Sequence, residues 1–530
     1  MKRLISLLLP VLAAGACTGG GLDPAGMTVD AEGRLLYHEM IVLGDRLEDP
    51  YSVETMTRAF AAAYPTKAER IPLPATDLYV RFLPADEREF GTLTDLGLML
   101  LDHPVDYEIV REGDYYHDPE LDADRITWQY SVVPADFSFP PGIRYEVLDR
   151  CYIPQETEAT RADDGVDWAL VEREAFRLTG NEALLDRQGD APGTRASSSG
   201  TPAGRITIVD DAPGSVPEGV RGVQVSCNSF VKFAQAYTDE DGNYRMTRSF
   251  SSRPRYRLVF RNSSGFSLGF NLLLVPASVS TLGKNDADGL DVGVTRQSDR
   301  KLFSRCVVNN AGYDYIRRCR TESPAIKNPP VNLRLWLFQA LEVSCPLMMQ
   351  QGVLVDGSKL TELLGEFSFL AKMFLPDVTL GLRGKDSYAE IYAEAVHAFA
   401  HASHFMLAGR DYWNDYVRFL LTSFVSSGFV DYGVGTEENF GHCEVGEMWA
   451  YFMQTLSCRE RYGEDAGSYG LHHWFHPQIL LQLEERGLSC GEIFQVLTGD
   501  VTDREVLRKK LISYYPEHKS AIMQVFARYN

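Results

Sequence analysis

A segment rich in glycine, proline and serine at residues 183–203 separates two parts of the chain. Pro192-Gly193 and Ser197-Ser198-Ser199-Gly200 have the composition of a linker. The chain has 530 residues, whereas a single hydrophobic core stops growing at roughly 250–300 residues. We therefore predict a multidomain α+β protein with about three domains.

The residue patterns on the two sides of this linker differ. Before it, residues 41–182 mix helical and strand patterns, which predicts an α+β N-terminal domain. After it, residues 204–295 have the pattern of a small β domain, and residues 300–530 are mainly helical. In the N-terminal domain we expect a helix capped by Ser52, a closing helix over 167–178, and strands at 78–83, 107–110, 127–130 and 144–147.

The first 16 residues have the features of a secretory signal peptide. Lys2 and Arg3 precede a short apolar run over 4–13, and small residues follow at 14–16. The apolar run is too short to span a bilayer. We expect residues 1–16 to be removed on export.

The small residues before Cys17 resemble the lipobox of bacterial lipoproteins, although Ala14 stands where Leu is usual. The resemblance implies a lipid on Cys17 and attachment to a membrane through that lipid. The glycines at 19–21 indicate a flexible tether, which we place at residues 17–40. Thr18 stands in place of the Asp that often retains lipoproteins at the inner membrane, which favours the outer membrane or cell surface. An ordinary secreted protein is the alternative.

Residues 204–295 carry three features of one β-sandwich family. These are an opening strand at 205–209, a variable loop, and a hairpin turn at 238–244 with the pattern Thr-Asp-x-x-Gly-x-Tyr. Together they resemble the carboxypeptidase-regulatory-like domain, a transthyretin-like β-sandwich that serves mainly as a spacer or adhesion module. Ser267 lies in a Gly-x-Ser-x-Gly pattern, but an apolar, strand-like run follows it, so we interpret the pattern as a turn and not as a nucleophile elbow.

A helix expected over 388–407 carries the most informative residues. His397, His401 and His404 fall on one face of it together with Glu394, and the whole chain has only 11 histidines. Two histidines at positions i and i+4 can bind one metal ion, as in zinc sites. The alternative is a structural histidine face that is satisfied by hydrogen bonds.

A third ligand would come from a later helix. Glu447 follows a glycine and precedes apolar residues that indicate burial, and a buried carboxylate needs a charged or metal partner. Glu444, one turn earlier, competes with it. His404 and His442 are further candidates for the metal or for contacts around it.

His397-x-x-x-His401 with Ala402-Ser403-His404, followed by Gly446-Glu447-Met448-Trp449, resembles a group of bacterial surface lipoproteins. Their C-terminal domain is similar to the zincins, which are zinc metallopeptidases. The resemblance implies zinc as cofactor, His397, His401 and Glu447 as its ligands, and a peptide or protein substrate. In the zincin motif H-E-x-x-H the Glu is the general base that activates the attacking water.

The chain departs from that motif at Ala398, which occupies the position of the general base and cannot accept a proton. Losing a positioned base typically removes about 10²–10⁴ in rate. Glu394 and the loop glutamates at 437–438 are the conceivable replacements. We predict a weak or inactive zinc-binding peptidase homologue, and as the alternative a surface binding or adhesion lipoprotein for peptides or glycans without metal chemistry.

Charge and cysteine content set two further limits. The formal net charge is -21, which argues against nucleic-acid binding, because that needs a basic patch. Eight cysteines follow Cys17 and form no Cys-x-x-Cys pair. We therefore expect buried thiols with one or two disulfides, and no cysteine-rich zinc site.

Overall fold

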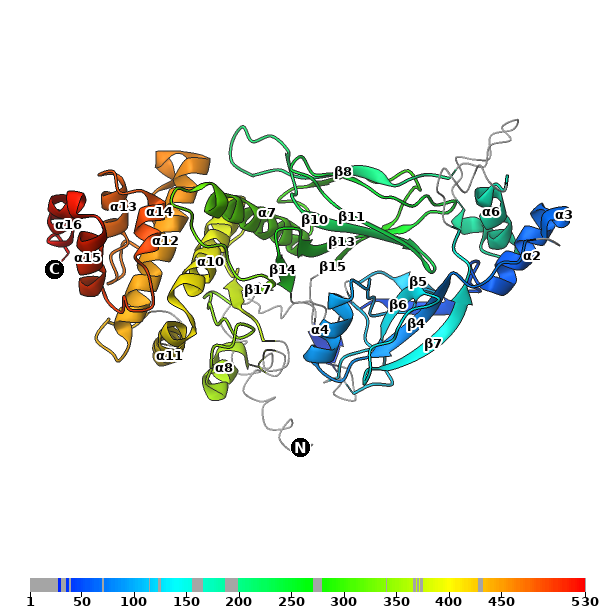
Figure 1. Ribbon diagram of the computed structural model, residues 1–530, viewed down its shortest axis with the longest axis horizontal. Coiled ribbons are helices and arrows are strands. Elements are labelled where there is room, and N and C mark those ends of the chain that lie inside the picture. Colours follow the sequence, from blue (N-terminus) through cyan, green and yellow to red (C-terminus); the bar gives the residue numbers. More distant parts are fainter. Residues whose placement is uncertain are drawn as a thin grey trace.

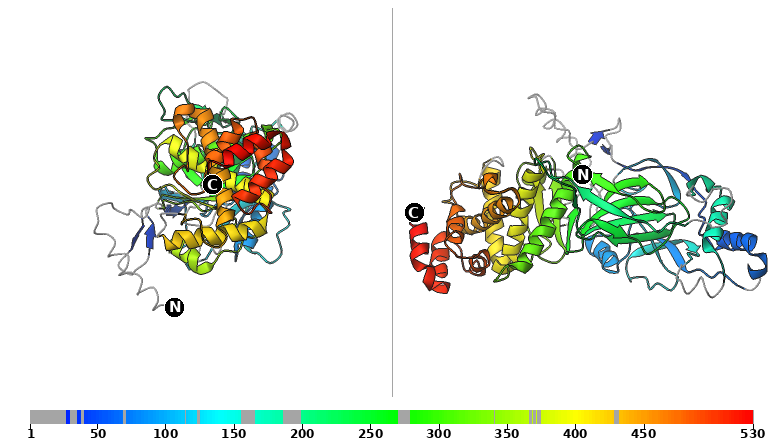
Figure 2. Two further views of the ribbon diagram at one scale, coloured as in Figure 1. Left: turned by 90° about the vertical axis from the view of Figure 1, so that its left-hand side faces the viewer. Right: turned by 90° about the horizontal axis from the view of Figure 1, so that it is seen from above.

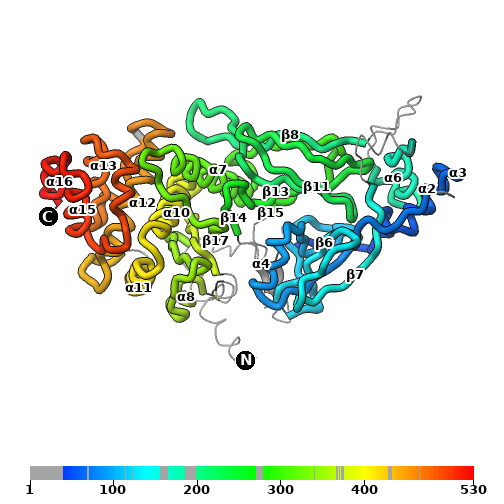
Figure 3. The backbone as a smooth tube through the Cα atoms, viewed as in Figure 1, coloured from blue at the N-terminus to red at the C-terminus, as the bar shows by residue number. Residues whose placement is uncertain are grey.

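The computed structural model describes residues 27–29, 35–37 and 40–529, except for 69–70, 114, 123–124, 155–164, 186–198, 270–278, 340, 366–367, 369–370, 372–374 and 428–431. The chain is a multidomain α+β protein, which confirms the predicted fold class. The molecule is elongated, with the C-terminal helices at one end and the N-terminal domain beside the β-sandwich toward the other (Figure 1). The backbone tube shows the same arrangement (Figure 3).

The N-terminal domain is built around a three-stranded antiparallel sheet in the order β6-β4-β7. Two helices, α2 and α6, pack against each other beside it. The side chains of Ser52 and Asp167 cap these two helices, at the positions where the sequence predicts helix starts. The elements are β1 (Met27–Val29), β2 (Leu35–Tyr37), β3 (Val42–Arg46), α2 (Val53–Ala63), α3 (Pro65–Ala68), β4 (Asp77–Leu83), α4 (Glu87–Asp95), β5 (Tyr107–Arg111), β6 (Gln129–Pro134), β7 (Arg144–Cys151) and α6 (Trp168–Leu178).

Two sheets form the sandwich. The smaller has the order β12-β8-β16 with β9 beside β8, and the larger contains β11-β10-β13 with β15 beside β13. Ile206 of one sheet and Leu258 of the other belong to the same buried core. The strands are β8 (Ala203–Ile208), β9 (Glu218–Gly219), β10 (Val223–Ser229), β11 (Lys232–Tyr237), β12 (Asn243–Arg245), β13 (Arg255–Asn262), β14 (Phe266–Gly269), β15 (Val279–Lys284) and β16 (Val292–Val294).

The larger sheet continues into the C-terminal part of the chain. Beyond β13 it runs through β14 to β17 (Leu333–Phe338) and β18 (Val378–Gly381), which pair in parallel. Ser267 lies inside β14, opposite Arg261 and beside Arg334. The apolar run that follows it, over 270–276, lies outside the described residues. The apolar stretch after residue 333 begins as a strand.

The C-terminal helices pack on the end of this sheet. The long helix α7 lies between the sandwich and α10, and a single buried core extends from the sandwich strands into the helices. Seen from above, the C-terminal helices lie at one end of the long axis and the strands of the sandwich lie next to them (Figure 2). The helices are α7 (Arg300–Thr321), α8 (Gly357–Leu364), α10 (Tyr388–Ala408), α11 (Arg410–Ser426), α12 (Phe440–Tyr462), α13 (Gln478–Glu484), α14 (Cys490–Gln495), α15 (Arg504–Tyr514) and α16 (Lys519–Phe526).

A buried ion pair joins the N-terminal domain to the sandwich. Lys232 of β11 contacts Glu172 of α6, and each residue is 1% exposed. The hydroxyl of Ser251 donates a second hydrogen bond to Glu172 at 2.9 Å. Removing one partner of a buried ion pair strongly destabilises a protein. Because Lys232 and Glu172 lie on different domains, separating the domains would break this pair, so the pair favours one relative orientation.

Two sequence predictions concern the termini and the cysteines. The predicted signal peptide, Cys17 and most of the tether and linker lie outside the described residues. The eight later cysteines are all buried free thiols, so the expected disulfides are not formed among them. Among the described helices, none is long and apolar enough to cross a membrane.

Candidate metal centre

Helix α10 brings two histidines to one buried face. Ser387 caps it in a reciprocal capping box with Glu390, and it ends at Gly409, whose φ is 86°. His397 and His401 are one turn apart, and only 7% and 1% of their surfaces are exposed. The local sequence therefore fixes both the start of the helix and the face on which the histidines lie.

Helix α12 supplies the facing carboxylate. Glu447 lies in its second turn and is 1% exposed. The residue before it must be small, because a Cβ atom on Gly446 would lie 2.8 Å from a ring carbon of Tyr416. Gly446 thus lets α11 approach α12 closely beside Glu447.

The β8–β9 connection of the sandwich anchors both helices. The backbone N–H of Tyr388, at the start of α10, donates to Asp211 at 2.7 Å. Arg461, near the end of α12, binds Asp210 at 3.0 Å and Glu218 at 2.6 Å. The sandwich is thereby part of the framework that sets the two helices against each other.

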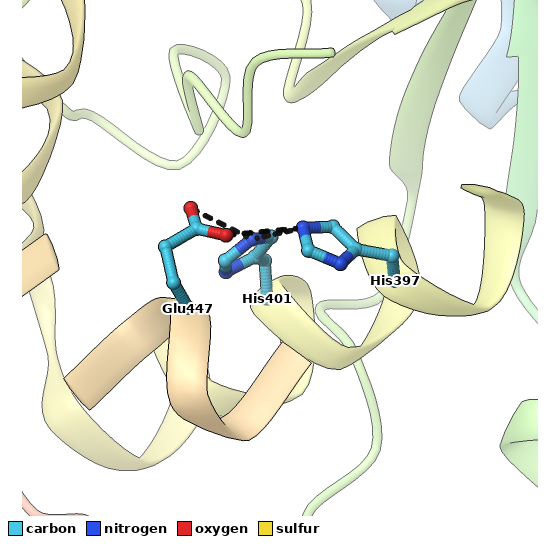
Figure 4. Close-up of side chains that lie close together, drawn as sticks. All are labelled: His397, His401 and Glu447. Carbon is cyan, nitrogen blue, oxygen red and sulfur yellow. Dashed lines mark hydrogen bonds and ion pairs between the residues drawn. The ribbon is translucent and has the colours of Figure 1, made fainter. Parts of the chain in front are cut away.

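The three side chains converge on one point between the helices (Figure 4). The Nε2 atoms of His397 and His401 lie 2.9 Å apart. The carboxylate oxygens of Glu447 lie 3.3 Å from Nε2 of His397 and 3.4 Å from Nε2 of His401. The prediction of Glu447, and not Glu444, as the partner of the two histidines agrees with this geometry.

Two further side chains hold this group in place. The Nδ1 atom of His397 lies 3.1 Å from Oε1 of Gln454, and the hydroxyl of Tyr416 donates to Oε1 of Glu447 at 2.5 Å. An amide oxygen can only accept, so Nδ1 of His397 carries the proton. In the neutral ring, Nε2 therefore presents a lone pair to the site, as a metal ligand must.

The electrostatics of the site are those of a buried carboxylate whose ion pairs are both with histidines. Burial opposes the ionisation of Glu447, but the charges and hydrogen bonds of His401 and His397 hold its pKa well below the usual range. Burial also opposes protonation of His397, yet Glu447 raises the pKa of His397 above its ordinary value. For His401 burial prevails and the pKa is lowered. Of the two histidines, His397 is therefore the one whose protonation Glu447 favours.

The group can hold a metal ion. Its ligand atoms all lie within 4.8 Å of one another. Ligand atoms around a tetrahedral zinc with bonds of about 2.1 Å lie about 3.4 Å apart, close to the two histidine–carboxylate distances. In addition, Nδ1 of His401 is buried and has no hydrogen-bond partner within the described structure. Oε2 of Glu447 is also buried, and its contact with Nε2 of His397 is long, at 3.3 Å. A cation at the point of convergence would satisfy the carboxylate.

The other candidate ligands are engaged elsewhere. Nε2 of His404 lies 3.2 Å from the carbonyl oxygen of Leu497, and burial lowers the pKa of His404 to about 3. Glu444 accepts the backbone N–H of Arg504 at 3.0 Å and pairs with its side chain. His442 packs its ring on Tyr412. None of these three joins the metal-ligand group of the described residues.

The candidate replacements for the missing base are also committed to other contacts. Glu394 accepts the hydroxyl of Ser344 and lies 3.5 Å from Lys385. Glu437 binds backbone N–H groups of its own loop at Val434 and Thr436. Ala398 itself is 2% exposed. Neither Glu394 nor Glu437 is therefore a free carboxylate aimed at the metal ligands, and Glu438 is exposed.

Sequence reasoning missed Gln454 and Tyr416. Gln454 lies seven residues after Glu447, two turns further along the same face of α12, so helical periodicity carries a signal for it. Tyr416 lies on α11, and nothing in its local sequence indicates that its hydroxyl reaches Glu447.

Comparisons of the chain with protein-family models, with curated proteins and with solved structures found no match. The function is therefore inferred from the residues themselves.

Proposed function

We propose that the C-terminal part of this chain is a zincin-like domain that binds one zinc ion through His397, His401 and Glu447. The observation that carries this proposal is the convergence of two histidine nitrogens and a buried carboxylate from two helices. Two nitrogens and one carboxylate oxygen form the donor set of catalytic zinc sites such as those of metallopeptidases. The bound ion would polarise a substrate carbonyl as a Lewis acid.

We further propose that the domain is a weak or inactive peptidase homologue. A positioned base is what removes the proton from the attacking water. Ala398 cannot do this, and Glu394 is held by Ser344 and Lys385. Binding of a peptide or protein without efficient cleavage follows from this arrangement.

We also propose that the protein is exported and is anchored to the outer membrane or cell surface by a lipid on Cys17. The support is the sequence alone: two positive charges, a short apolar run, and small residues before the cysteine. We also propose that residues 204–295 form a carboxypeptidase-regulatory-like domain. The two-sheet arrangement of their strands is compatible with this proposal.

Metal content measured by mass spectrometry tests the proposal. The full chain is purified without a histidine tag, beside the double variant His397→Ala/His401→Ala. His117→Ala/His518→Ala serves as the matched control, because it removes two histidines far from the site. We expect about one zinc per chain in the parent and the control, and none in the first variant.

Absence of zinc from the parent, even after reconstitution, would overturn the metal site. The histidine helix would then be structural, and the chain would be a surface binding protein for peptides or glycans. Equal zinc in the parent and in His397→Ala/His401→Ala would place the ion elsewhere and would equally overturn the assignment.

A further inference from the structure

A small cavity lies where the N-terminal domain meets the sandwich, far from the metal centre. Its volume is about 40 Å³. Strands β13 and β15 of the sandwich form one side, and residues 103–109 of the N-terminal domain form another. Figure 1 shows the two domains side by side at this point.

The charged side chains that line this cavity are all basic. They are Arg253, Arg255, Arg257 and Lys284, and the lining includes no Asp or Glu. The chain as a whole has 73 acidic and 52 basic residues, so a cavity lined by cations alone is contrary to its general composition.

The strand pattern explains how these cations come together. Residues at alternate positions of a strand point to the same face, so Arg255 and Arg257 share one face of β13, and Arg253 lines the cavity from just before the strand. Lys284 of β15 lies directly opposite Arg255. Like charges in opposite positions destabilise a sheet, and Glu112 offsets part of this repulsion by pairing with Arg255.

The acidic partners of these cations lie outside the cavity. Arg255 pairs with Glu112, which lines a neighbouring cavity instead. Arg253 lies 3.7 Å from Asp286, which is half-exposed.

Arg257 is the innermost of the four. It is 5% exposed and donates to Asn228 at 2.6 Å, with Nε2 of His103 at 3.3 Å as its other partner. Both partners are uncharged when His103 is neutral, and burial lowers the pKa of His103. Asp102 contacts the other nitrogen of the His103 ring: its Oδ1 lies 2.7 Å from Nδ1. A buried guanidinium without a directly bound carboxylate carries a desolvation cost.

The titration behaviour agrees with a surplus of positive charge. Burial and the neighbouring Arg255 lower the pKa of Arg257 to about 10. Burial and the same Arg255 also lower the pKa of Lys284. An anion held among these groups would reverse both effects.

We propose that this cavity binds a compact oxyanion, either a free sulfate or phosphate ion or the terminal sulfate or phosphate group of a larger molecule. Arginine guanidinium groups donate paired hydrogen bonds to such groups, and Lys284 adds a point charge. A cavity needs roughly 10–15 Å³ to hold one water, so this one has room for a small anion but not for a bulky ligand. A larger molecule would insert only its charged end.

Isothermal titration calorimetry of the full chain with sodium sulfate, at ionic strength held constant with chloride, tests the proposal. The variant Lys284→Ala removes one exposed cation of the cavity. Lys284→Arg restores the charge, and Arg245→Ala removes a cation from an exposed position in the other sheet. Titration with glucose 6-phosphate beside free phosphate distinguishes a free ion from a terminal group.

We expect saturable sulfate binding that Lys284→Ala weakens about tenfold, as for loss of one charge-assisted hydrogen bond. Lys284→Arg and Arg245→Ala should bind like the parent. Binding of free phosphate without glucose 6-phosphate would identify the ligand as a free ion, and binding of both would identify it as a terminal group. Failure of sulfate and phosphate to bind saturably, or equal binding by the parent and Lys284→Ala, would overturn the proposal.

Discussion

His397 and Gln454 are joined by a 3.1 Å hydrogen bond between Nδ1 and Oε1, and this bond fixes which nitrogen of the imidazole faces Glu447. The two residues lie on different helices, α10 and α12. The bond therefore sets both the tautomer of the ring and its rotation relative to the carboxylate. Gln454 acts as a positioning residue for the proposed metal ligand.

Replacing Gln454 by Leu should weaken zinc binding. Leu keeps most of the volume but leaves Nδ1 of His397 without its acceptor, so the ring loses its preferred tautomer. Removing such an outer partner typically costs about 10–100-fold in metal affinity. Competition with a chromophoric chelator measures the zinc affinity of the full chain.

The matched control is Gln495→Leu on α14, whose side chain donates to the carbonyl of Ala325 away from the site. This variant should bind zinc like the parent. If Gln454→Leu kept the parental zinc affinity, the hydrogen bond would have no role in positioning His397.

Replacing Tyr416 by Phe should destabilise the metal-free protein. The change removes the hydroxyl that donates to Oε1 of Glu447 at 2.5 Å, and hydrogen bonds to charged groups contribute about 1.5–3 kcal/mol. Urea unfolding after treatment with a chelator measures the loss. Tyr313→Phe is the control, because its hydroxyl reaches Glu240 only at 3.4 Å on the surface, and we expect less than about 0.5 kcal/mol there. Equal effects of the two variants would contradict the importance of the Tyr416 bond.

The sequence predicted individual helices and strands better than it predicted the contacts between helices and strands distant in the chain. Ser52 caps a helix where expected, because capping depends on a few adjacent residues. The choice of Glu447 over Glu444 also followed from local burial signals. The continuation of the sandwich sheet into β17 and β18 was not predicted, because parallel pairing of distant strands leaves no local pattern.

Two further features that the sequence did not predict also depend on packing between residues distant in the chain. The hydroxyl of Tyr416 reaches Glu447 because Gly446 lets the helices approach. Arg255 and Arg257 alternate with the apolar Tyr256 and Leu258 in the sequence, which is the pattern of the polar face of a half-buried strand. Its burial arises only when the N-terminal domain covers it, and sequence periodicity cannot reveal that cover.

Asp49 should make stability fall as the pH rises through the weakly acidic range. Burial raises the pKa of Asp49 to about 7, with Asp149 and Asp106 adding to the rise while the Tyr51 N–H and Arg46 oppose it. In the unfolded chain the pKa is about 3.9. Between these values the folded state keeps a proton that the unfolded state has lost, so this group's contribution to the free energy of unfolding declines.

Asp49→Asn removes this titration. Relative to the parent, the variant should therefore gain stability with rising pH, by at most about 1.4 kcal/mol per pH unit between pH 4 and 7. Urea unfolding at pH 4.5 and 7.5 measures the difference. Asp136→Asn, at an exposed position, should leave the pH dependence unchanged. A pH-independent difference between Asp49→Asn and the parent would show that Asp49 is ionised in the fold.

Ala398→Glu should raise peptidase activity if the zinc site and the zincin-like reading are both correct. The change places a carboxylate one residue after His397, at the position of the general base in the motif, and a positioned base contributes about 10²–10⁴ in rate. Cleavage of fluorescein-labelled casein by the zinc-loaded full chain measures the gain. Ala398→Gln is the matched control, since it has the same size and no proton acceptor of comparable strength. Because Ala398 is 2% exposed, zinc stoichiometry is measured on both variants to establish that the site survives the larger side chain. If both retain zinc and cleave casein equally slowly, the missing carboxylate is not what limits this domain, and its role is binding.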